Sequence, residues 1–282
     1  MDSIGRARRV PRARVAALLP WVLSLYGGLG CQLPGPEPAD VAAVSQTSAE
    51  APDARRLLAP LAASLGLARL QGSTRVRTIL TDRWQSPVDR WLRPLAAAEQ
   101  RLELVLDLRE RSVRARFVGG RRDAETIGIK AGLAYTLVEG AREYGPDSGV
   151  EGYLGSIQRY FELPLRLAAA GEGTVLPTAE AGALRVLEPQ TLGGETFDRV
   201  RLEPSRVRGG DPVVAWIERA SGRVRWAELI DSGLLGFGQR ALHFVEYSEV
   251  QRALLPRVIE VVPAVGSTAV VRRLEFDALE LD

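Results

Sequence analysis

The last two thirds of the chain alternate between hydrophobic and polar positions with a period of two. In residues 101–109 (RLELVLDLR) every even position is Leu and the odd positions are mostly charged. This is the period of a β-strand with one buried face and one solvated face. The same alternation returns in residues 112–118, 127–138, 183–187, 197–202, 213–218, 223–230, 242–247, 257–262 and 270–281.

Short, turn-like segments join most of these strands. They are residues 110–111, 119–120, 193–194, 209–211 and 220–222, and most of them contain Gly. Strands that follow one another so closely pair as antiparallel hairpins. A sheet of about ten strands curls, and its apolar face then needs a cover.

Helices predicted from a period of three to four residues can provide this cover. Residues 149–167 carry apolar side chains at spacings of three and four, and the segment opens with a capping box at residues 148–151 (SGVE). Pro164 is expected to end or kink this helix. Residues 53–70 predict a second helix, and residues 88–98 are a third candidate. The predicted fold is therefore α+β: a strongly curved antiparallel sheet, forming an unclosed half-barrel of about ten or eleven strands, with helices covering the concave face.

The first 30 residues differ from the rest in charge and hydropathy. They hold five Arg against one acid, followed by an apolar run over residues 15–29. This is the layout of a secretory signal peptide, and the run is shorter than the roughly 20 residues that a spanning helix needs. Without residues 1–30 the chain has 32 basic and 34 acidic side chains, a net charge of −2. We therefore expect export and no nucleic-acid partner.

The only cysteine, Cys31, directly follows this segment in the sequence LYGGLGCQ. The sequence resembles the lipobox of bacterial lipoproteins, in which a small residue, here Gly30, precedes a Cys that is acylated and becomes the new N-terminus. Gly28 departs from the Leu that is usual three residues before the Cys, and an ordinary signal peptidase could cut the same bond. Three states of Cys31 thus stay open: acylated (for example with palmitate), free in a secreted chain, or part of an uncleaved anchor.

We favour acylation, because a lone thiol in an oxidising compartment is otherwise a liability. The lipoprotein resemblance, with Gln32 rather than Asp after the Cys, implies the outer membrane. Residues 31–52 are rich in Pro, Ala, Ser and Glu and cannot bury a core. They predict a flexible tether with a reach of roughly 25 Å, followed by a single domain over residues 53–282.

Composition limits the chemistry that the domain can perform. With one Cys and one His in 282 residues, neither a disulfide framework nor a zinc site built from several Cys and His ligands is available. Any Ser-His mechanism would depend on His243 alone, and the spacing of the acids selects no catalytic pair. We therefore predict no enzyme, no metal and no cofactor.

Two stretches carry a resemblance to a known family. The mid-chain helix includes the aromatic-Leu-Pro-Leu sequence YFELPL at residues 160–165, and residues 215–224 (AWIERASGRV) read as a strand, a turn and a strand. With the N-terminal helix, the hairpins and the export signal, residues 53–282 resemble the LolA/LolB-like half-barrels of periplasmic lipoprotein carriers and outer-membrane lipoprotein receptors. The resemblance implies a helix-capped, unclosed barrel that holds acyl chains, so the partner would be a lipid or an acylated protein.

Side chains at inward positions would line such a cavity. We expect the lining to include Leu104, Leu106, Phe117, Ile157, Phe161, Trp216 and Trp226. The same alternation also describes a dry core in which these side chains pack against the helices, and the pattern does not separate the two interpretations.

One glycine-rich loop is unusually apolar. Residues 231–239 place Leu234, Leu235 and Phe237 among three glycines, where a polar turn would be expected. In one interpretation the loop contacts membrane lipid, as the protruding loop of the resembled receptor does. In the other, which we favour, a glycine-bulged strand turns these side chains to the core.

The sequence thus predicts a lipid-anchored envelope protein that faces the periplasm from the outer membrane and binds lipid or the acyl chains of lipoproteins. One alternative is an envelope scaffold with a dry core, whose protein partner docks on an edge strand. Another is a periplasmic protein without an anchor.

Overall fold

The computed structural model describes residues 51–66, 70, 75–91, 95, 97–145, 147–172, 184–203, 212–230 and 240–282. The predicted signal peptide, Cys31, nearly all of the tether and the apolar loop at residues 231–239 lie outside these residues. Thr47–Asp282 form one compact unit, and the description below concerns this unit.

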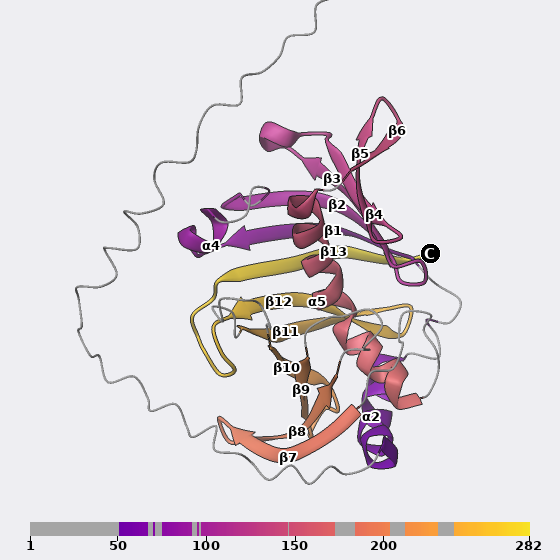
Figure 1. Ribbon diagram of the computed structural model, residues 1–282. Helices are drawn as coiled ribbons and strands as arrows, with labels where there is room; N and C mark the ends of the chain where they lie inside the picture. Colours follow the sequence, from indigo (N-terminus) through magenta and orange to yellow (C-terminus); the bar gives the residue numbers. More distant parts are fainter. Residues whose placement is uncertain are drawn as a thin grey trace, which may run out of the picture. The chain divides into compact units, whose positions relative to one another are not determined.

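A single antiparallel sheet of thirteen strands forms the body (Figure 1), in the order β6-β5-β4-β3-β2-β1-β13-β12-β11-β10-β9-β8-β7. The strands are β1 (Arg75–Trp84), β2 (Glu99–Asp107), β3 (Ser112–Val118), β4 (Thr126–Lys130), β5 (Leu133–Val138), β6 (Ala141–Tyr144), β7 (Leu184–Leu192), β8 (Glu195–Leu202), β9 (Val213–Glu218), β10 (Val224–Leu229), β11 (Arg240–Val250), β12 (Ala253–Val262) and β13 (Arg272–Leu281).

Two runs of consecutive hairpins meet at the middle of this sheet. Strands β1 to β6 extend to one edge and strands β13 back to β7 extend to the other, with β1 paired to β13 at the junction. Helix α5 (Ser148–Glu172) follows β6 and precedes β7 in the chain, so it connects the two edge strands. The prediction of an unclosed, curved antiparallel sheet with helices is confirmed.

The structure has more strands than the sequence pattern predicts. Strand β1 is missing from the prediction because Thr78 and Asp82 occupy inward positions, where an apolar residue would mark a strand. Residues 127–138 form two strands rather than one, since Ala131 and Gly132 adopt positive φ values of 52° and 80° in a turn. Strand β6 has only exposed residues and therefore gives no alternation.

The helices begin and end differently from the prediction. Helix α2 spans Ala51–Leu65, and the candidate at residues 88–98 is only the short α4 (Pro87–Trp91). Helix α5 does not end at Pro164 but continues for two further turns. Its N-cap is Asp147, not Ser148: Oδ1 of Asp147 accepts hydrogen bonds from the backbone N of Gly149 (2.9 Å) and Val150 (3.1 Å).

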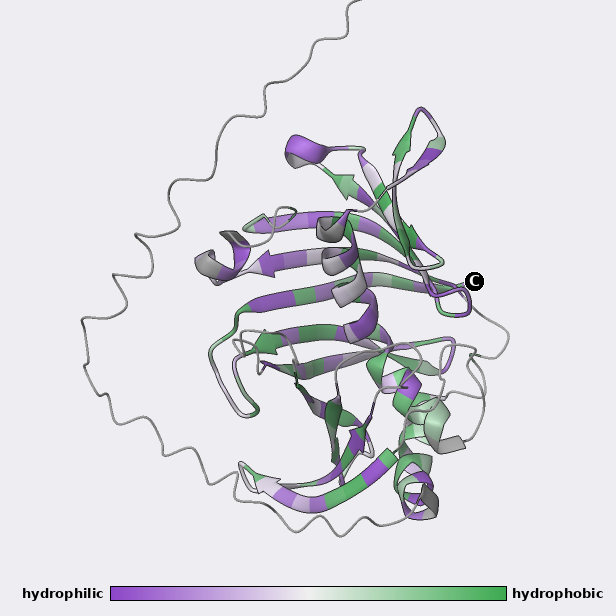
Figure 2. Ribbon diagram, viewed as in Figure 1, coloured by the Kyte–Doolittle hydropathy of each residue, from purple (hydrophilic) through white to green (hydrophobic). Residues whose placement is uncertain are grey.

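One face of the sheet and the helices α2 and α5 form the main core. Figure 2 shows hydrophobic residues at alternate positions of the central strands behind α5. Phe161 of α5 packs on Phe276 of β13 with ring centroids 5.0 Å apart, and both are fully buried. Helix α5 also contacts α2 and the strands β3, β4, β5 and β12, so it covers strands on both sides of the β1–β13 junction.

The other face of the sheet carries a smaller apolar cluster on β8 to β12. Its buried residues are Phe197, Val214, Trp216, Trp226, Ala241 and Val262. Val265 and Val270, from the connection between β12 and β13, pack against it. This half of the sheet therefore has buried apolar residues on both faces.

None of the described helices is long and apolar enough to cross a membrane. Within the same described ranges, no three side chains of His, Cys, Asp or Glu come together as a metal site would require.

Candidate functional site

Five of the seven predicted lining residues lie together in the main core. They are Leu104, Leu106, Phe117, Ile157 and Phe161, each at most 3% exposed. Strands β2 and β3 and one side of α5 thus share a continuous apolar interior. Such an interior is what an apolar ligand requires, and also what a dry core requires.

The two tryptophans belong elsewhere, and the expectation that they line the same interior is wrong. Trp216 and Trp226 are part of the smaller cluster on the opposite face. Trp216 directly follows Ala215, which lies in the main core, and successive residues of a strand point to opposite faces. Trp226 is paired with Trp216 on the neighbouring strand and shares its face.

A buried ion pair lies at the junction of β1 and β13. Arg272 donates from Nε to Oδ1 of Asp82 (2.8 Å) and from Nη2 to Oδ2 (3.0 Å). The two side chains are 3% and 0% exposed. This bidentate geometry is the strongest form of an Arg–carboxylate contact. It connects the two strands on which the two halves of the sheet meet.

Helix α5 completes what we call the Asp82 group: Asp82, Trp84, Tyr153, Ser156 and Arg272. Tyr153 Oη donates to Oδ2 of Asp82 (2.7 Å), and Trp84 Nε1 donates to the same oxygen (3.2 Å). Arg272 Nη1 donates to Ser156 Oγ (3.0 Å). The guanidinium carbon lies 4.6 Å from the Trp84 ring centre and 5.2 Å from that of Tyr153.

The electrostatics of the Asp82 group follow from its burial. Burial, and then the charge of Asp82, raise the pKa of Tyr153 well above its ordinary value. Burial alone would lower the pKa of Arg272, but the Asp82 carboxylate outweighs it and raises that pKa. The group is therefore a charged, hydrogen-bonded tie between α5 and the centre of the sheet. Sequence reasoning missed it because it missed β1.

A second polar group lies further along α5. We call Arg111, Gln158, Glu162 and Arg166 the Glu162 group. The three helical members are spaced by four residues and so share one side of α5, while Arg111 comes from the β2–β3 turn. Gln158 Nε2 donates to Glu162 Oε1 (2.7 Å), and Glu162 is only 4% exposed.

The Glu162 group contains a carboxyl whose ionisation is strongly perturbed. Burial raises the pKa of Glu162 to about 7, against the opposing effects of the Gln158 hydrogen bond and the positive charges of Arg166 and Arg111. Burial also lowers the pKa of Arg166, and repulsion from Arg111 adds to this. The Nε atom of Arg166 is buried without a hydrogen-bond partner in the described part of the chain.

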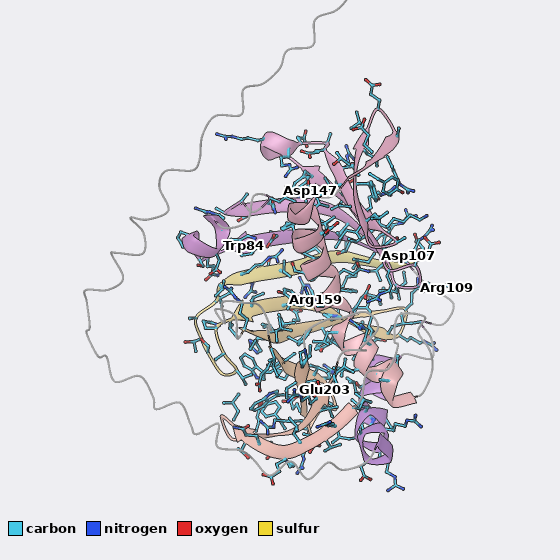
Figure 3. All side chains as sticks on the ribbon, in the orientation of Figure 1. Trp84, Asp107, Arg109, Asp147, Arg159 and Glu203 are labelled. Carbon is cyan, nitrogen blue, oxygen red and sulfur yellow. The ribbon has the colours of Figure 1, made fainter. Side chains whose placement is uncertain are left out.

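The turn that carries Arg111 is held by Asp107, which Figure 3 labels beside Arg109. Oδ1 of Asp107 accepts hydrogen bonds from the backbone N of Arg109 (3.0 Å) and Glu110 (2.8 Å), and Oδ2 accepts one from Arg75 Nε (3.1 Å). Burial opposes ionisation, but these hydrogen bonds outweigh it and lower the pKa of Asp107. The turn is thereby anchored to β1 and β2.

His243, the only histidine, lies on the face of the smaller cluster. Its ring stacks on Trp226 at 3.9 Å, and Nδ1 is 3.4 Å from Oε2 of Glu260. Burial lowers its pKa, although the Glu260 contact opposes this. These contacts are those of a framework residue.

The remaining predicted site residues lie outside the described residues. They are Gly30, Cys31, Leu234, Leu235 and Phe237.

Comparison with known proteins identifies the fold. No protein-family model matches the sequence, and no curated protein matches it. Among solved structures, a DUF1329 family protein from Desulfovibrio piger superposes with a TM-score of 0.53 at 9% identity, over 83% of this chain and 94% of that one. A LolA superfamily protein from Nitrosomonas europaea superposes with a TM-score of 0.50 at 12% identity, over 78% of this chain and 92% of that one.

At these identities the likeness concerns the fold alone. The half-barrel architecture that the sequence resemblance implied is confirmed: the chain has a LolA-like fold.

Proposed function

With the LolA-like fold as the premise, we propose that the chain is an exported, lipid-anchored envelope protein that binds an apolar ligand, a lipid or the acyl chains of a lipoprotein. The ligand would lie between α5 and the apolar face of β2 and β3. The observation that carries the proposal is the continuous apolar interior formed by Leu104, Leu106 and Phe117 of the sheet and Ile157 and Phe161 of α5.

The open sheet supports this proposal. A closed barrel has a fixed circumference, whereas a sheet with two free edges, β6 and β7, can widen. Since the interior side chains are already buried against one another, a ligand would gain its space by an outward shift of α5. The Asp82 group would then set the position about which the helix moves.

The proposed cellular arrangement comes from the N-terminal sequence. Cleavage after Gly30 and acylation of Cys31 would anchor the chain, residues 31–52 would be the tether, and residues 53–282 would be the single binding domain. The location would be the periplasmic side of the outer membrane. The segment with Leu234, Leu235 and Phe237 would either contact the membrane or complete the core.

A dry scaffold is the second candidate function. It is favoured by the burial of all five interior residues named above, and by the edge strand β6, whose four residues are all exposed and available for pairing with a partner.

The decisive test is mass spectrometry of lipid that co-purifies, without detergent, with the full-length chain carrying Cys31→Ser. We expect a lipid at near-stoichiometric amounts. Ala115→Phe adds bulk at a fully buried inward position of β3 and should displace it. Val118→Phe adds the same ring at an exposed position of the same strand and should leave the lipid in place. A chain that carries no lipid and takes up none when it is offered would favour the scaffold.

A further inference from the structure

The Glu162 group holds more positive than negative charge. Arg111 and Arg166 both act on the single carboxyl of Glu162. Gln158 contributes no charge. The group therefore has two arginines for one carboxyl, and both arginines are partly buried, unlike the Asp82 group, where one Arg meets one Asp.

One N–H of Arg166 has no hydrogen-bond acceptor among the residues that the structure describes. The Nε atom of Arg166 is buried, and no acceptor among the described residues takes its hydrogen. A buried donor without a partner costs about 1–3 kcal/mol. A carboxylate or phosphate oxygen in the plane of the guanidinium would remove this cost and compensate the charge.

The Glu162 group also borders the apolar interior. On α5, Phe161 and Leu165 are neighbours of Glu162 and Arg166 in sequence and belong to the main core. On β2, the buried Leu106 and the adjoining Leu108 lead directly into the turn that carries Arg111. One ligand can therefore contact both regions if it has an apolar chain and a charged end.

We propose that the Glu162 group binds the anionic head of an amphiphile whose alkyl chain occupies the interior, with Arg166 and Arg111 as the charged contacts. This inference rests on the proposed function and adds the class of ligand: an alkyl chain that ends in a carboxylate or a phosphate. A protonated Glu162 would donate a hydrogen bond to the head instead of repelling it, and its pKa of about 7 supports this.

Displacement of an uncharged, environment-sensitive dye tests the proposal. The full-length chain carrying Cys31→Ser is loaded with N-phenyl-1-naphthylamine at pH 6.5 and titrated with hexadecanoic acid, hexadecyl phosphate or hexadecanol. These competitors share one chain length and differ in the head. We expect the two anions to bind at least about tenfold more tightly than the alcohol, which is the effect of one charge-assisted hydrogen bond.

Three variants distinguish the loss of a charged contact from damage to the fold. Arg166→Gln should reduce the preference for the anions to within about twofold and leave the affinity for hexadecanol unchanged. Arg114→Gln removes an exposed arginine from the outer side of β3 and should change neither. At pH 8, Glu162→Gln should strengthen anion binding, since it removes a competing negative charge; a merely damaged fold would weaken it.

Each other outcome has a distinct meaning. If the dye binds and all three competitors displace it equally, the anionic site is wrong and the apolar cavity stands. If neither dye nor competitor binds, the proposed function itself fails. If inorganic phosphate alone stabilises the chain against heating, and Arg166→Gln abolishes that effect, the group binds a free anion and the amphiphile is wrong.

Discussion

The Asp82 group and the Glu162 group both include side chains of helix α5, and they differ in how their charges are compensated. In the Asp82 group every named polar side chain has a partner within 3.2 Å, and the carboxylate and guanidinium pair through two hydrogen bonds. In the Glu162 group the carboxyl has one partner, Gln158, and a buried guanidinium N–H has none among the described residues.

This difference is the basis of the proposal that the Glu162 group binds an anion, whereas the Asp82 group stabilises the fold. Burying charge is expensive, and a fold that buries it compensates it wherever only structure is at stake. A buried guanidinium N–H without an acceptor among the described residues makes the Glu162 group a candidate binding site for an anion. The Asp82 group thus attaches α5 to the sheet, and the Glu162 group is the proposed binding site.

Breaking the Asp82 group should give the largest loss of stability. Arg272→Met leaves the fully buried Asp82 without its counter-ion, and we expect about 3–5 kcal/mol less free energy of unfolding. Chemical denaturation measures it. The double variant Asp82→Leu/Arg272→Met should recover a large part of this loss. A single-variant loss below about 1 kcal/mol would mean that the pair is not the attachment described above.

Replacing the carboxyl of the Glu162 group should instead increase the free energy of unfolding. The pKa of Glu162 is about 7 in the fold and near 4.5 when exposed, so the folded state retains a proton that the unfolded chain releases. Stability from this group is therefore complete below about pH 4.5 and is lost as the pH rises through 7. Glu162→Gln should remove that loss and add about 1–3 kcal/mol at pH 8. Denaturation at pH 5 and pH 8 checks it; Glu151→Gln, on the exposed side of the same helix, is the control.

Weakening the N-terminus of α5, the helix that carries members of both groups, should cause a smaller loss of stability. Asp147→Ala removes the side chain that caps the backbone N of Gly149 and Val150, and we expect about 1 kcal/mol of destabilisation. Hydrogen exchange should increase first in the N-terminal turn, beside the Asp82 group. Asp147→Asn keeps the acceptor and should restore most of the stability; equal losses in both variants would contradict the cap.

The smallest effect is expected from an exposed ion pair. Arg83 donates to Glu275 (2.7 Å) and to Glu99 (3.1 Å) on the solvated face, with 40% of its side chain exposed. Arg83→Gln should cost no more than about 0.5 kcal/mol, and less at high salt. A loss similar to that of Arg272→Met would show that burial does not distinguish the two ion pairs.

The sequence was a good guide where one physical pattern dominates. The hairpins from β2 to β3 and from β9 to β10 are predicted because one face is apolar and the other is wet. The pattern does not predict strand β1, because Asp82 occupies an inward position. The partner of Asp82, Arg272, lies almost two hundred residues away. No local pattern indicates that an inward acid will be paired.

The site was predicted in part for the same reason. Leu104, Phe117 and Ile157 follow from periodicity alone. The size and apolar character of Trp216 favour the interior, but its neighbour Ala215 faces that interior, so Trp216 faces the opposite side of the sheet. Glu162 and Arg166 share one side of α5, but a spacing of four on a helix does not distinguish a solvated pair from a buried one.

The junction of β1 and β13 has a consequence for the order in which the sheet folds. Every other strand pairs with a neighbour in sequence, so two separate ribbons of hairpins can form early from local contacts. The two ribbons join only when β13 pairs with β1. Asp282, directly after β13, also exchanges backbone hydrogen bonds with Arg75. Removal of β13 would therefore not shorten an edge of the sheet; it would separate the two halves and leave β1 and β12 as new unpaired edges that are prone to aggregation.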